Sequence, residues 1–154
     1  MPRSSLSVEE ILDSLLRDTG ALTVMLITKQ GTVVAEAGNI SGLNSTAMAA
    51  LVAGMFSATH EVARLVGEEQ FSILLQQGER RHIHISLVAS QSMMIVVFED
   101  QNRIGMIRHA ARKASEKLVG LLAADRSSEL ASTEISAPAF KEYALNLIDR
   151  IFQP

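Results

Sequence analysis

Two histidines stand one residue apart in a segment with strand character, at positions 82 and 84 of "HIHISLV" (82–88). Side chains at i and i+2 of a strand lie on the same face, so His82 and His84 could together hold a metal ion. A metal needs further ligands, yet the chain has no cysteine, and the nearest carboxylate, Glu79, lies across a turn. The spacing therefore favours a solvated or helix-covered strand face, with no metal and no cofactor.

A second group of chemically active side chains is basic and follows one side of a predicted helix. Its members are Arg103, Arg108, Arg112, Lys113 and Lys117, opposed locally by Glu116. A solvated helix face is the simplest interpretation, and a surface for an acidic partner is the alternative. The sequence has no GxxxxGK[ST] loop for nucleotide phosphates, and no Ser-His-Asp or paired-carboxylate site can be argued from it. We expect no catalytic site of its own.

Composition bounds the class of protein. The chain has 154 residues, 47% of them hydrophobic and 20% charged, with a net charge of −3. This predicts one globular domain, with or without an appendage, and gives no electrostatic reason to bind nucleic acid. The start "MPRSSLSVEEIL" lacks the apolar run of a signal peptide, and no apolar stretch approaches the roughly 18 residues of a membrane span. We expect a soluble cytoplasmic protein without membrane insertion.

The order of the predicted elements indicates an α+β domain over 1–124 on an antiparallel sheet. Ser7 and Glu10 form a capping box for a first helix, which Gly20 ends. The further elements are strands 21–28 and 32–38, a long helix to Val66, strands 71–77, 82–88 and 93–99, and a third helix over 104–124. Strand 93–99 is apolar on both faces, which predicts a place at the centre of the sheet.

The end of the chain changes character. Residues 125–138 are rich in Ser, Thr and acidic residues and predict a flexible linker. Residues 139–152 then predict a short tethered amphipathic helix. Its apolar side would consist of Phe140, Tyr143, Leu147 and Ile151. Such a helix could dock on its own domain, on a partner subunit or on another protein.

The long helix raises a packing question. Helical spacing predicts that its largest apolar residues face the sheet, namely Met48, Leu51, Val52, Met55, Val62 and Val66. Ala50, Ala53 and Ser57 then point nearly the opposite way, where a surface helix normally carries charge. Either these alanines are simply good helix formers on a solvated face, or the smooth face is a contact surface.

Several blocks of the sequence carry a resemblance to a known family. They are "LVAGMFSATHEVARLVGEEQF", "QQGER", "MIVVFED" and "RIGMIRHAARKASEKL". In this order and spacing the chain resembles the Roadblock/dynein light-chain family, and within it the MglB-type regulators of MglA-type, Ras-like GTPases. The resemblance implies the order α-β-β-α-β-β-β-α, with a five-stranded antiparallel sheet between a long central helix and the terminal helices. It also implies a homodimer joined through the long helices and the 71–77 edge strands.

The resemblance further implies which residues make contacts. The expected GTPase-binding set is Ala50, Ala53, Gly54, Ser57, Glu61 and Arg64. The expected dimer interface is Ala49, Ala58, Phe71, Ile73 and Leu75. If an arginine were inserted into the partner's active site, which is worth about 10³–10⁵ in rate, the candidates would be Arg64, Arg80 and Arg81. MglB-type proteins are not thought to work in this way, so we expect these arginines to be ordinary surface and turn residues.

The function that the resemblance implies is that of a non-enzymatic regulator in bacterial cell polarity or motility. It would bind the GTP form of a small Ras-like GTPase and speed hydrolysis. Its C-terminal helix would promote nucleotide exchange, and the protein would concentrate at a cell pole. Two alternatives stay open. One is a Roadblock scaffold that assembles polarity or motility proteins without stimulating a GTPase, and the other is a small-ligand sensor.

Overall fold

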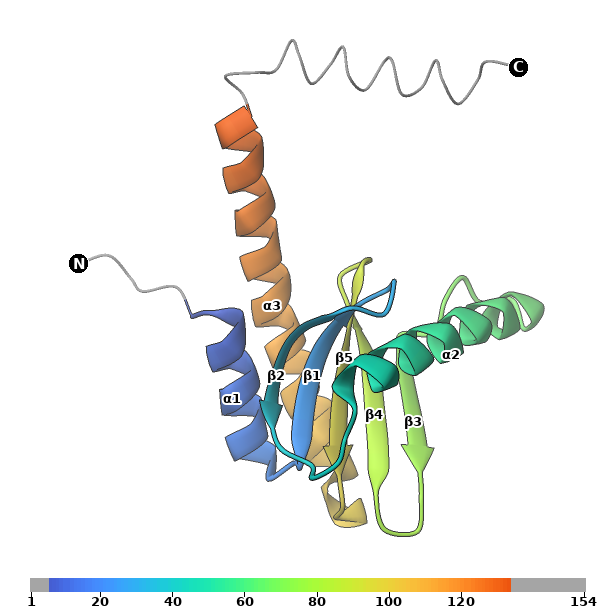
Figure 1. Ribbon diagram of the computed structural model, residues 1–154. Coiled ribbons are helices and arrows are strands. Elements are labelled where there is room, and N and C mark those ends of the chain that lie inside the picture. The colour runs from blue at the N-terminus through green and yellow to red at the C-terminus, as the bar shows by residue number, and fades with distance from the viewer. Residues whose placement is uncertain (1–5, 134–154) are drawn as a thin grey trace. The chain divides into compact units, whose positions relative to one another are not determined.

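A five-stranded antiparallel sheet with helices on both faces organises the chain (Figure 1). The computed structural model describes residues 6–133. The elements are α1 (Val8–Thr19), β1 (Thr23–Thr28), β2 (Val33–Gly38), α2 (Ser45–Leu65), β3 (Ile73–Gln77), β4 (His82–Val88), β5 (Ser92–Phe98), a 3₁₀ turn (Gln101–Arg103) and α3 (Ile104–Thr133). None of the helices in this part of the chain combines the length and apolar character needed to span a bilayer.

The strand order in the sheet is β2-β1-β5-β4-β3, with every neighbouring pair antiparallel. β5 is therefore the central strand, which confirms the prediction from its apolar composition. β3 is an edge strand, as expected for 71–77. At the other edge, β2 contacts both α1 and α2.

Local capping signals position the helices, and those of the first helix are the ones predicted. The Ser7 hydroxyl accepts a hydrogen bond from the Glu10 amide at 3.2 Å, and Gly20 takes the left-handed conformation (φ 66°) that ends α1. The Asn44 side chain accepts from the Ala47 amide at 3.0 Å and so begins α2. These caps orient the chain where it leaves and returns to the sheet.

The sheet has a helix layer on each face. α2 covers one face, where its buried residues pack with alternate residues of the central strands, such as Ile27, Ile85 and Ile95. α1 and α3 lie on the other face. They are linked where α3 begins, because the Arg103 guanidinium donates a hydrogen bond to the Thr19 carbonyl at 2.9 Å. This arrangement confirms the expected α+β fold.

The third helix is longer than predicted. α3 continues to Thr133, so residues 125–133 are helical rather than part of a flexible linker. This stretch contains neither Gly nor Pro, and Pro138 is the first strong helix breaker after it. The serines and threonines therefore lowered helix propensity without ending the helix. The helix expected over 139–152 lies outside the described residues.

Candidate protein-interaction surface

The orientation of α2 differs from the one predicted. The residues that it buries against the sheet are Ala49, Val52, Ala53, Phe56 and Ala63. Leu51, Val62 and Val66, which were expected in the core, are 74%, 52% and 67% exposed. The helix is thus rotated about its axis relative to the prediction. As a result, Ala49, expected in the dimer interface, and Ala53, expected in the GTPase-binding surface, are buried within the domain, with exposed fractions of 0% and 7%.

Close approach to the sheet explains why small residues occupy the buried side of α2. Gly31 lies in the turn between β1 and β2 with φ 90°, and a Cβ placed there would be 3.0 Å from the Cα of Ala50 and 3.3 Å from the Cβ of Ala53. A larger side chain at Ala53 would push the turn away from α2. The alanines on this side therefore serve packing rather than recognition.

The exposed side of α2 consists of two strips that run along the helix. The apolar strip is Leu51, Ala58, Val62 and Leu65. The small-residue strip is Ala50, Gly54, Ser57, Glu61 and Arg64. At about 100° per residue the two strips lie side by side, and both point away from the sheet.

The small-residue strip contains all of the predicted GTPase-binding residues except Ala53. A Cβ at Gly54 would meet nothing within 4 Å, so packing inside the described domain does not require a glycine here. Glycine inside a helix costs about 1 kcal/mol relative to alanine. The absence of a side chain at this exposed position is therefore unexplained by the domain alone and is what a close approach from outside would need.

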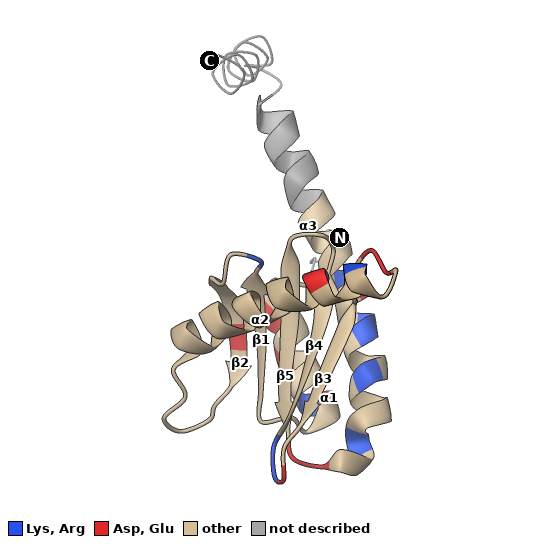
Figure 2. Ribbon diagram, turned by 90° about the vertical axis from the view of Figure 1, so that its right-hand side faces the viewer, with Lys and Arg blue, Asp and Glu red and all other residues tan. Residues whose placement is uncertain are grey.

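Charge enters α2 only near its C-terminal end (Figure 2). Glu61 and Arg64 form an ion pair of 3.9 Å between side chains that are 72% and 67% exposed. A pair this open to solvent contributes little to stability. The other two candidate arginines flank the turn before β4, where Arg80 is exposed and Arg81 reaches Glu99 at 3.6 Å.

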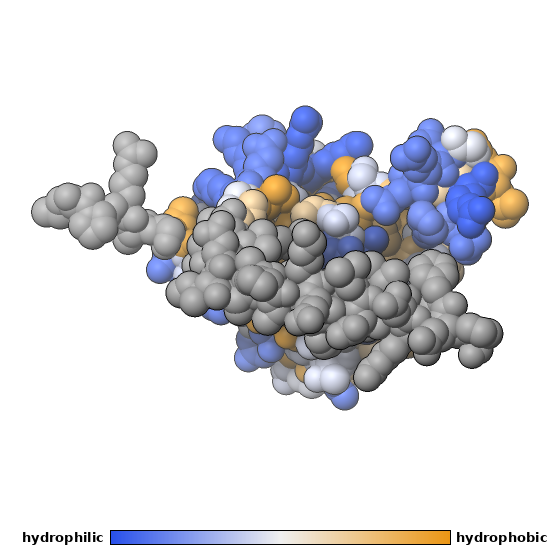
Figure 3. Space-filling model, turned by 90° about the horizontal axis from the view of Figure 1, so that it is seen from above, coloured by the Kyte–Doolittle hydropathy of each residue, from blue (hydrophilic) through white to orange (hydrophobic). Residues whose placement is uncertain are grey.

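Large apolar side chains are exposed on the apolar strip of α2 and on the edge strand β3, which follows α2 in the chain. Leu65 is 86% exposed, and apolar surface is visible where α2 ends, at the right of Figure 3. On β3, Ile73 and Leu75 are each 38% exposed, while Phe71 is half-buried. Of the predicted dimer residues, all but Ala49 are thus at least partly accessible. Sequence reasoning missed Leu51, Val62 and Leu65, although together with Ala58 they are spaced by seven, four and three residues, which is typical of a helix–helix seam.

The two strand histidines are covered by a helix layer, which is one of the two environments that the sequence left open. His82 and His84 are 1% and 2% exposed, on the sheet face that α3 covers. In residues 6–133 no group of three potential metal ligands comes together. Burial, together with the nearby Arg108 guanidinium, lowers the pKa of His84.

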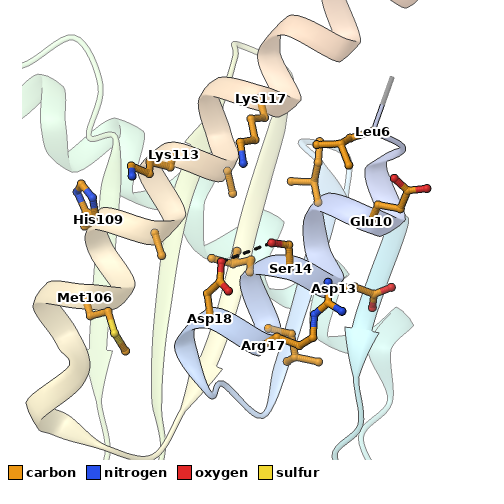
Figure 4. A pocket seen from close by; sticks show the side chains of 15 residues that line it. Leu6, Glu10, Asp13, Ser14, Arg17, Asp18, Met106, His109, Lys113 and Lys117 are labelled. Carbon is orange, nitrogen blue, oxygen red and sulfur yellow. Dashed lines mark hydrogen bonds between the residues drawn. The ribbon is translucent and has the colours of Figure 1, made fainter. Parts of the chain in front are cut away.

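A groove of about 760 Å³ lies between α1 and α3 (Figure 4). Its α1 side carries Asp13 and Asp18, and its α3 side carries Lys113 and Lys117. Ser14 donates to Asp18 at 3.4 Å, a weak contact between exposed side chains. The predicted contact residues Phe140, Tyr143, Leu147 and Ile151 lie outside the described residues.

Comparison with known proteins identifies the family of the chain. The sequence pattern of the Roadblock/LC7 domain matches residues 7–98. No curated protein matches significantly. Among solved structures, MglB of Myxococcus xanthus is 26% identical with a TM-score of 0.74, over 79% of this chain and 99% of that one. The gliding protein MglB of Thermus thermophilus is 28% identical with a TM-score of 0.68, over 77% and 91% of the two chains. A structure described as MglB with tetrameric arrangement is 27% identical, with a TM-score of 0.69 over 77% and 90%. The chain therefore belongs to the Roadblock/LC7 domain family.

Proposed function

We propose that this protein is a homodimeric regulator of a small, MglA-type, Ras-like GTPase in bacterial cell polarity or motility. The observation that carries the proposal is the division of the exposed side of α2 into two chemically different strips. One strip has the character of a permanent interface and the other that of a surface open to a second protein. The likeness to MglB structures supports the same assignment.

The apolar strip and β3 pair with a second copy of the chain. Leu51, Val62 and Leu65 are too large and too exposed to be left in water on a helix of this length. Antiparallel pairing of the two β3 strands satisfies the backbone groups of an open sheet edge. The dimer interface then comprises Ala58, Phe71, Ile73 and Leu75 together with Leu51, Val62 and Leu65.

The small-residue strip receives the switch region of the GTPase in its GTP form. Ala50, Gly54 and Ser57 allow a partner backbone to come close, and Glu61 and Arg64 supply polar contacts at one end. The regulator stimulates hydrolysis by reshaping the partner's own catalytic residues, and it needs no active site. The C-terminal segment 139–152 promotes nucleotide exchange. Deletion of 138–154 should therefore slow exchange and leave the dimer intact.

Replacement of Ser57 by arginine tests the proposed contact. An arginine in the middle of the small-residue strip should abolish binding to the GTP-loaded MglA-type GTPase and the stimulation of its hydrolysis, because the long side chain prevents close approach. Gln101→Arg is the control, since it introduces the same charged side chain at an exposed site outside α2. Binding would be measured by interferometry with the GTPase in both nucleotide states, and hydrolysis by phosphate release.

The results separate regulator from scaffold. A regulator prefers the GTP form and raises turnover, whereas a scaffold binds both forms equally or neither. A Ser57→Arg variant that still binds and stimulates would place the contact elsewhere. Arg64→Ala should keep both activities, and a loss of stimulation with binding intact would instead identify Arg64 as an inserted catalytic arginine.

A further inference from the structure

Strand β4 carries three buried polar side chains on the face that α3 covers. They are His82, His84 and Ser86, at alternate positions and with exposed fractions of 1%, 2% and 7%. In the described residues, neither ring nitrogen of either histidine has a hydrogen-bond partner, nor does the Ser86 hydroxyl. Buried polar groups are almost always hydrogen-bonded in native proteins, so a row of three without partners needs an explanation.

Two of these side chains line a cleft between α3 and the β3–β4 pair. The cleft has a volume of about 750 Å³, and His84 and Ser86 are among the residues of its lining. Arg108 and Arg112 line it from α3. A volume of this size suits a small organic molecule. The cleft lies on the face of the sheet opposite α2, away from both strips of that helix.

The charges at the cleft favour an anion. Arg108 has no ion-pair partner among the described residues, and Arg112 is only loosely paired with Glu116, at 4.0 Å between side chains that are 83% and 72% exposed. Guanidinium groups bind carboxylates and phosphates with directed, charge-assisted hydrogen bonds. Glu116 also lines the cleft, so its lining carries two arginines against one carboxylate, and only Arg112 is near that carboxylate.

The rim adds apolar contact area. Ile73 and Val119 line the same cleft and are 38% and 40% exposed. A bare inorganic ion would leave these side chains in water. The lining therefore fits a molecule that carries an acid group on an apolar body.

We propose that the cleft between α3 and β3–β4 binds a small organic anion, a phosphate monoester or a carboxylate on an apolar substituent. Arg108 and Arg112 hold the acid group, His84 and Ser86 form the sheet side of the cleft, and Val119 covers the apolar part. This site does not depend on the proposed GTPase contact, because no residue of α2 belongs to it. It also gives a role to the basic side of α3 and to the strand histidines.

The full-length protein should be titrated with phenyl phosphate and with benzoate while the histidine ring signals are followed by NMR. Either probe, at millimolar concentration, should shift the His84 signals in a saturable way, and phenol, which lacks the charge, should not. Whichever of the two acids binds identifies the acid group. Inorganic phosphate should bind more weakly than phenyl phosphate, since it makes no apolar contact.

Substitutions on α3 decide whether the cleft itself is responsible. Arg108→Gln should weaken binding about tenfold or more, the usual effect of losing a charge-assisted hydrogen bond. Lys113→Gln is the matched control, because it removes the same charge from the same helix but on the side of the α1 groove. It should leave the affinity unchanged. Both positions are exposed, so circular dichroism should show an unaltered fold for each variant.

Three results would overturn the assignment. They are the absence of any saturable His84 shift with either acid, an equal loss of affinity in the Lys113→Gln and Arg108→Gln variants, and equal affinity for inorganic phosphate and phenyl phosphate. Without a saturable shift there is no site. An equal loss in both variants would mean that binding is general electrostatic attraction. Equal affinity for the two phosphates would mean that the apolar part of the ligand makes no contact.

Discussion

His84 is the residue at which burial and charge act most clearly together. Its imidazole is almost completely covered, and it lies near the Arg108 guanidinium. Both conditions penalise the protonated ring, burial more than the arginine, and lower the pKa of His84 from its ordinary value of 6.5. The folded protein therefore holds this histidine in its neutral form.

The pH dependence of stability follows from the sign of this shift. The unfolded chain binds the His84 proton more readily than the folded chain does, so stability is complete above the unfolded pKa of 6.5 and falls as the pH drops through the lower folded pKa. We expect a lower melting temperature at about pH 5.5 than at about pH 7.5, where histidines change charge.

Substitution identifies the responsible side chain. His84→Leu should reduce the difference between the two melting temperatures, whereas His60→Gln, at an exposed position, should not. Differential scanning calorimetry at both pH values makes the measurement. An unchanged pH dependence in His84→Leu would mean that other groups titrate in this range.

At single positions, the sequence was informative where spacing is short and local. It predicted that His82 and His84 share one strand face, that Ser7 caps the first helix, and that Ser57 is exposed. It misplaced Ala49 and Ala53, because alanine is small enough for either side of a helix. Only the approach of the Gly31 turn decides that these alanines face inward.

The rotation of α2 is the main difference at the level of elements, and paired substitutions test it. Ala49→Leu should destabilise the domain by about 1–3 kcal/mol, the usual cost of inserting methylene groups into a packed core. Gly54→Ala should instead stabilise it by about 0.5–1 kcal/mol, because the new methyl group meets open space and the helix gains propensity.

Urea denaturation of the two variants provides the comparison. Opposite signs are expected, and a stabilising Ala49→Leu would support the orientation predicted from periodicity. The proposed dimer adds to the measured stability of every variant, so the proteins should be compared at equal concentration.

The rotation also explains a limit of reasoning from periodicity. The most apolar side of a helix is usually assigned to the core, and here that side carries Leu51, Val62 and Val66. The sheet instead receives a side with smaller residues. A helix that packs against two surfaces has two apolar sides, and spacing alone does not say which side faces which surface. Similarly, the end of α3 was misplaced because serine and threonine lower helix propensity without breaking a helix.

At the scale of the whole molecule, the proposed dimer can be tested by measuring the state of association. The double variant Leu51→Glu/Leu65→Glu places two like charges in the apolar strip. The unaltered protein should sediment as a dimer, and this variant should sediment as a single subunit. Ser57→Glu, in the neighbouring small-residue strip, is the control and should stay dimeric. Analytical ultracentrifugation at micromolar concentration distinguishes the two states.

The outcome bears on the proposed function directly. If the unaltered chain sediments as one subunit, the apolar strip has another partner and the regulator would require a different arrangement. The order and type of the helices and strands were predictable at this scale because each carries a strong local pattern. The side of each helix that faces the sheet was not predictable in this way, because it is decided only when the sheet and the helices pack together.

The two borders of the sheet differ, and this bears on how many copies can join. β2 is in contact with both α1 and α2, whereas the one described strand that pairs with β3 is β4, and the β3 side chain Gln76 reaches Met55 of α2. If one β3 pairs antiparallel with another, both β3 edges are used in a single step, and the joined sheet ends in β2 on each side. The strand that remains at each border is then the one that two helices contact, which leaves less bare edge for the runaway polymerisation into fibres that exposed edge strands invite.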